Sequence, residues 1–145
     1  MADIYDVLTA LEGIAAETIA RNGVAARPLA ALRSAVADMG KALEAGDLNR
    51  WAEADEHFHS QLVQLSGNSR LIQMVAQLWD QAHRARMLTL KLRPTPTNSV
   101  TEHAALVDAI ASGDPVEARR IHEDHRRRAG KMLVELLERL GLTQL

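Results

Sequence analysis

The sequence of 145 residues contains no cysteine and no long apolar run. Without cysteine the chain forms no disulfide, offers no thiolate to a metal and has no cysteine nucleophile. No stretch approaches the roughly 20 unbroken apolar residues of a membrane span. Residues 1–6 lack the basic segment and apolar run that begin a secretory signal. We therefore expect a cytoplasmic protein without a membrane segment.

Aromatic residues are also scarce, at 3% of the chain, so aliphatic side chains and methionine must fill the core. The formal net charge is only −2. Because nucleic-acid binding depends largely on neutralising phosphates, this balance gives the chain no general attraction to DNA. The hydrophobic fraction of 47% and charged fraction of 25% are those of an ordinary globular protein. We expect residues 1–145 to form a single domain that does not itself bind DNA.

Apolar residues recur at the three- and four-residue spacing of amphipathic helices along almost the whole chain. Gly, Asn and Asp at the junctions supply helix stops and N-caps, and Pro115 suits the first turn of a helix. No useful stretch alternates with period two. The fold class we predict is an all-α antiparallel bundle of about six helices, with ends near 22–23, 46, 65, 93, 113 and 140.

Two of the predicted helix starts bear on the site. Asn68 follows Gly67 and is expected to cap a helix, with a second possible role as a donor in a pocket. Ser99 and Glu102 have the spacing of a capping box, in which both side chains accept hydrogen bonds from free backbone N–H groups. His103 would then lie at the end of the first turn of that helix.

The most informative residues are Asp55, His59, His103 and His125. Asp55 and His59 are four residues apart on one predicted helix and share a face, whereas His57 should point away. One carboxylate and three imidazoles are ligands that first-row divalent metals prefer. Taken singly, the Asp–His pair would more often be a surface ion pair, and His125 precedes three arginines typical of a solvated face. Facing helices of a bundle can nevertheless bring all four together.

The ordered motifs resemble the effector-binding C-terminal domain, FCD, of FadR-type GntR transcription regulators. The resemblance covers essentially the whole chain. It rests on Leu11-Glu12-Gly13-x-Ala15-Ala16, Asp55-x-x-Phe58-His59-x-x-Leu62, Ser66-Gly67-Asn68-x-x-Leu71, Ser99-x-x-Glu102-His103-x-x-Leu106, Ala109-Ile110-x-x-Gly113-Asp114 and His125. It implies an all-α bundle, a homodimer, and a metal held by Asp55, His59, His103 and His125. Family members carry a winged-helix DNA-binding domain ahead of this one, which we expect this chain to lack.

Such a site would hold Zn or Ni, with Mn or Fe also admitted by these ligand types. Four protein ligands leave one or two coordination positions open, which invites a small carboxylate as the effector. Arg84 and Arg86 are candidates to donate charge-assisted hydrogen bonds to that anion. His122 lies three residues before His125 and could substitute for it or support it. Asn68 and His122 complete the expected effector-binding residues.

Two other functions use the same residues. A metalloenzyme could employ the ion to activate water. Against this, only Glu56 and Glu102 lie near enough to act as a general base beyond Asp55, and Glu102 is expected to cap a helix. A dimerisation domain with a purely structural metal is the other alternative.

Overall fold

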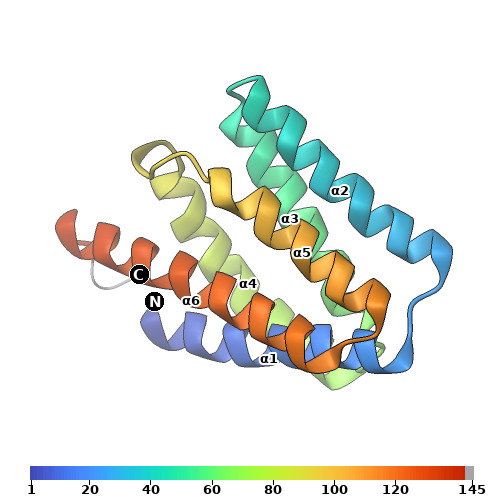
Figure 1. The fold of residues 1–145 in the computed structure, drawn as a ribbon. Coiled ribbons are helices and arrows are strands. Elements are labelled where there is room, and N and C mark those ends of the chain that lie inside the picture. The colour runs from blue at the N-terminus through green and yellow to red at the C-terminus, as the bar shows by residue number, and fades with distance from the viewer. Residues whose placement is uncertain (143–145) are drawn as a thin grey trace.

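The computed structural model describes residues 1–142, which form six α-helices and no strand (Figure 1). The predicted all-α antiparallel bundle is therefore confirmed. A 3-10 turn, η1 (Leu90–Leu92), follows the fourth helix. The helices are α1 (Ala2–Asn22), α2 (Ala26–Glu44), α3 (Leu48–Leu65), α4 (Ser69–Thr89), α5 (Thr97–Ser112) and α6 (Pro115–Arg139).

The first and last helices lie side by side and antiparallel, so that both ends of the described chain are at the same end of the bundle (Figure 1). Gly130 permits this close approach: a Cβ built there would lie 2.7 Å from Cδ1 of Tyr5. α2, α3 and α5 form the other side, and α4 runs behind α6 in this view. Within the described residues no helix has both the length and the apolar character needed to cross a bilayer.

Most predicted helix ends are confirmed. Asp47, Asn68 and Asp114 each accept a hydrogen bond from a backbone N–H in the first turn that follows them. Gly113 ends α5 in the left-handed conformation, with φ of 72°. These helix ends can be predicted from the sequence because each capping or terminating residue is adjacent in sequence to the backbone groups that it affects.

The predicted capping box is wrong. α5 begins at Thr97, two residues before Ser99, and no side chain caps it. Pro96 occupies the cap position, and its ring restricts the backbone as the chain enters the helix. Ser99 therefore lies inside the first turn and is buried. Both Ser99 and Glu102 are released to contact histidines.

Two clusters of aliphatic side chains fill most of the interior, and Phe58 is the one phenylalanine, fully buried between helices. The interior is unusual in also burying six ionisable side chains that belong to neither cluster. Each is at most 3% exposed: Glu12, Asp55, His59, His103, His122 and Arg126. Buried groups of this kind need partners. Their arrangement defines the site.

A candidate metal centre beside a cationic cavity

Four side chains from three helices converge in the interior. Asp55 and His59 come from α3, His103 from α5 and His125 from α6. Each offers one ligand atom, and these four atoms all lie within 4.8 Å of one another. We call these residues the candidate metal centre. They are the four residues singled out from the sequence, whereas His57 is exposed on α3.

The ligand atoms of the centre lie close enough together to surround one cation. Nε2 of His103 lies 3.1 Å from Nε2 of His59, and 3.4 Å from Oδ1 of Asp55. Oδ1 of Asp55 is buried and accepts no hydrogen bond. An orphaned carboxylate oxygen facing two imidazole nitrogens is the donor set that a divalent metal would satisfy.

Each histidine of the centre is held through its Nδ1 atom. His103 Nδ1 donates to the Ser99 carbonyl at 2.6 Å, and His125 Nδ1 lies 2.6 Å from a Glu102 oxygen. His59 Nδ1 lies 3.1 Å from a Glu12 oxygen. An Nδ1–H donor leaves Nε2 unprotonated and able to coordinate, and this is how proteins usually orient metal-binding histidines.

Burial and neighbouring charges set the protonation states that coordination requires. Burial lowers the pKa of His103 well below its usual range, and it also lowers the pKa of His125. Both imidazoles are therefore neutral at neutral pH, the form that binds metals. Burial alone would raise the pKa of Asp55, but the adjacent Arg86 guanidinium and His59 hold that pKa well below its usual value. Asp55 is therefore an anion.

Glu12 is the central residue that the sequence did not reveal. It is fully buried on α1, and Arg126 of α6 donates to both of its oxygens, at 2.6 and 2.9 Å. Trp79 Nε1 donates to it at 3.2 Å, and His122 Nε2 lies 3.2 Å away. Burial raises the pKa of Glu12, yet Arg126 and then His122 hold it well below the usual value. Nothing local marks this role, because its partners, from His59 to Arg126, lie 47 to 114 residues away in the sequence.

Glu12, His59 and His122 also lie close enough to form a second cation-binding group. The twin hydrogen bonds from Arg126 argue against a cation there, because they already neutralise the Glu12 carboxylate. His122 is better described as part of the support for His59. It does not line the large cavity beside the centre.

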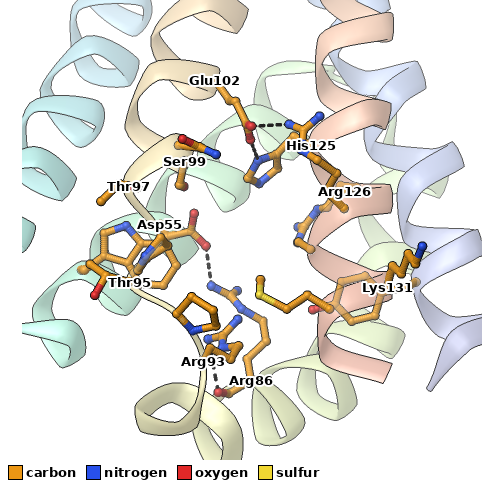
Figure 2. A pocket seen from close by; sticks show the side chains of 18 of the residues that line it. Asp55, Arg86, Arg93, Thr95, Thr97, Ser99, Glu102, His125, Arg126 and Lys131 are labelled. Carbon is orange, nitrogen blue, oxygen red and sulfur yellow. Dashed lines mark hydrogen bonds and ion pairs between the residues drawn. The ribbon is translucent and has the colours of Figure 1, made fainter. Parts of the chain in front are cut away.

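That cavity has a volume of about 410 Å³ and opens beside Asp55 and His125. Arg86 of α4 reaches into it and forms an ion pair with Asp55, while Glu102 binds His125 on the opposite wall (Figure 2). Residues from α1, α3, α4, α5, α6 and the segment 93–96 complete the lining. Its volume is in the range of small-molecule sites.

The other residues predicted to bind an effector lie elsewhere. Arg84 is exposed on α4 and is not part of the cavity wall. Asn68 is exposed at the start of α4, where its side chain accepts hydrogen bonds from Arg70 N and Leu71 N. Of the four, only Arg86 lines the cavity. A helix repeats every 3.6 residues, so Arg84 and Arg86 could not both face the same wall.

Fold and site together define an all-α domain with a buried Asp–His centre at the edge of a cavity. The model of the FCD domain family matches residues 3–128, and the chain belongs to this family.

Two relatives agree with that assignment. The chain is 49% identical over 63 residues, 42% of its length, to an uncharacterized HTH-type transcriptional regulator in the TAR-I ttuE-ttuC' intergenic region of Agrobacterium vitis. A Streptomyces ambofaciens HTH-type regulator in an unstable DNA locus is 35% identical over 81 residues, 56% of the chain. The chain spans 37% and 34% of the lengths of these two relatives.

The fold is also similar to two solved structures. Streptococcus agalactiae GntR matches with a TM-score of 0.76 and 24% identity, over 90% of this chain and 57% of that one. E. coli McbR/YncC matches with a TM-score of 0.82 and 18% identity, over 92% and 67%. At these identities the likeness establishes the fold.

The burial of His122 generates a prediction for the metal-free protein. Burial lowers the pKa of His122 to about 4, against roughly 6.5 in an unfolded chain. Between these values the unfolded state binds a proton that the folded state does not, so stability falls as the pH decreases. We expect His122 to contribute about 3 kcal/mol of this loss between pH 6.5 and 4.

Urea unfolding in EDTA across that pH range measures the effect. His122→Asn should flatten the dependence of the free energy of unfolding on pH, while His57→Asn, at an exposed position, should leave it unchanged. Parallel curves for wild type and His122→Asn would show that His122 takes up its proton in the folded state as readily as in the unfolded one.

Proposed function

We propose that this chain is the metal-containing, effector-sensing domain of a GntR-family transcription regulator of the FadR type. Membership of the FCD family supports a regulatory role. The observation that carries the metal proposal is the convergence of Asp55, His59, His103 and His125 beside a cavity. Zn or Ni is the ion we expect, with Mn or Fe compatible with the same donors. A regulator of this kind would work in the cytoplasm.

The effector we propose is a small organic acid. When bound, a divalent cation supplies open coordination positions to an anionic oxygen. The protein's own part is to orient the three imidazoles through Nδ1 and to keep Asp55 ionised beside Arg86. Arg86 can then donate to the incoming carboxylate as well, because a guanidinium has five N–H groups.

The centre joins α3, α5 and α6, so an effector bound there would contact side chains from three helices. An effector changes the protein's conformation only if it binds one arrangement of these helices more strongly than the other. A winged-helix domain joined to this one would read that change, and DNA would be contacted only through it.

We expect metal binding to require the four residues jointly. His59→Ala or His103→Ala should abolish stoichiometric metal, because each removes one of the four converging donors, whereas His57→Ala should retain it because His57 is exposed and points away. Because burial lowers the pKa of His103 and His125, affinity should persist at pH 6.5 and fall at lower pH as protons compete. Equilibrium dialysis with elemental analysis measures both effects. Loss of the metal in His57→Ala would refute the assigned helix face.

Effector binding is tested by a thermal-shift screen of small carboxylic acids, run with and without chelator. An acid that binds only the folded, metal-loaded protein should stabilise it by about 2.7 kcal/mol at a hundredfold excess over Kd. Chelation should remove most of this effect. Hits that are indifferent to the metal would refute metal-anchored sensing, and a metal without any acid response would favour a structural ion.

We also propose a homodimer that uses exposed apolar side chains of α1 and α4. Val7, Ile14 and Met74 are 42%, 37% and 50% exposed, and these two helices contact each other. Apolar residues left on one face of adjacent helices are typical of an interface between copies. Sedimentation velocity should give a dimer that Val7→Glu converts to a monomer. A wild-type monomer throughout a dilution series would refute this proposal.

A further inference from the structure

We propose that the cavity binds a dicarboxylate, with one carboxylate directed to the candidate metal centre and the other to Arg93. This inference rests on the proposed function and narrows the class of its effector. It starts from an arginine that the rest of the site leaves without a counterion.

Arg93 lies directly after η1, where the chain turns toward Pro94, and its side chain lines the cavity (Figure 2). Its Nε atom is buried and has no hydrogen-bond partner. Its one hydrogen bond runs from an Nη2 atom to the backbone carbonyl of Arg86, at 3.4 Å. Most of the five N–H groups of this guanidinium therefore have no protein acceptor.

Within the described residues Arg93 is the exception among the cationic side chains of the cavity wall, because it forms no ion pair. The other four each have a carboxylate: Arg86 pairs with Asp55, Arg126 with Glu12, Arg128 with Glu102 and Lys131 with Glu135. Glu12 also contacts His59, Glu102 also contacts His125, and Asp55 is itself part of the candidate metal centre. They are therefore not free to turn toward Arg93.

The surroundings of Arg93 favour an added anion. Burial lowers its pKa, and the neighbouring Arg86 cation lowers the pKa further, so the charged form lies in an unfavourable environment. A buried charge without a counterion is costly, whereas a carboxylate that accepts two parallel hydrogen bonds from a guanidinium offsets that cost. An anion next to Arg93 would offset both the burial of its charge and the repulsion from Arg86.

A single carboxylate cannot serve the centre and Arg93 equally well. Asp55 already neutralises Arg86. The positive charges still available to a ligand are therefore the bound metal at one end of the cavity and the Arg93 guanidinium at the other. A monocarboxylate on the metal leaves Arg93 unpaired, and one on Arg93 leaves the metal open. The cavity, at about 410 Å³, has room for a molecule with an acid group at each end.

Isothermal titration of the zinc-loaded protein with matched acids tests this inference. The probes are straight-chain dicarboxylates from malonate to adipate, each compared with its monoamide, which replaces one carboxylate by a neutral group of similar size. A hydrogen-bonded charge pair contributes about 1.5–3 kcal/mol, so the best dicarboxylate should bind roughly 10- to 100-fold more tightly than its monoamide. Arg93→Gln should reduce that ratio to about one, mainly by weakening the dicarboxylate.

Arg84→Gln is the matched control, because Arg84 is exposed on α4 outside the cavity and its loss should leave the ratio intact. Circular dichroism checks that each variant is folded.

Three outcomes would overturn the inference: dicarboxylates and monoamides bind equally, the affinity ratio survives Arg93→Gln, or no dicarboxylate binds. Equal but metal-dependent binding would overturn only this inference. A ratio that depends on Arg93 and survives chelation would support the Arg93 subsite and overturn the metal anchor.

Discussion

The ion pair between Glu12 and Arg126 is the interaction on which the interior of this domain depends. It joins the first helix to the last, and both members are buried. A buried charge that loses its partner costs about 3–5 kcal/mol, so each residue fixes the position of the other. The same carboxylate reaches His59 Nδ1 and thereby turns Nε2 toward Asp55 and His103. The polar interior thus follows from how α1 and α6 pack.

Asp55 links this buried support to the cavity. It faces the imidazoles with one oxygen and Arg86 with the other. An ion at the centre and an acid in the cavity would both compete for these contacts, and the balance among them involves α3, α4 and α5. Coupling between an effector and a neighbouring domain needs an element of this kind, whose arrangement depends on what is bound.

The helices and their ends were predictable because their signals are local: a three- to four-residue apolar repeat, an Asp or Asn cap, a glycine stop. The Asp55–His59 pair was visible for the same reason. His103 and His125 were candidates because imidazoles are metal ligands and both lie on later predicted helices, and the family resemblance supported all four residues. Glu12 and Arg126 were not predictable, because an acid on an amphipathic helix and an arginine in a run of three are usually solvated. Their burial depends on the approach of α1 to α6, which no local pattern encodes. The predicted capping role of Ser99 and Glu102 is wrong because the helix begins earlier, directly after Pro96.

The electrostatics of the site do not tune Asp55, Glu102 or Glu12 as a general base. A general base works best with a pKa near the working pH. Here His125 and Arg128 hold the pKa of Glu102 below its usual value, and Arg86 holds that of Asp55 well below. Glu12 is buried under Arg126 and is not part of the cavity wall. Asp55, Glu102 and Glu12 instead neutralise arginines and lie against histidines of the interior. Each of these three carboxylates faces both an arginine and a histidine, and each has a pKa lowered away from the neutral range in which a general base works best.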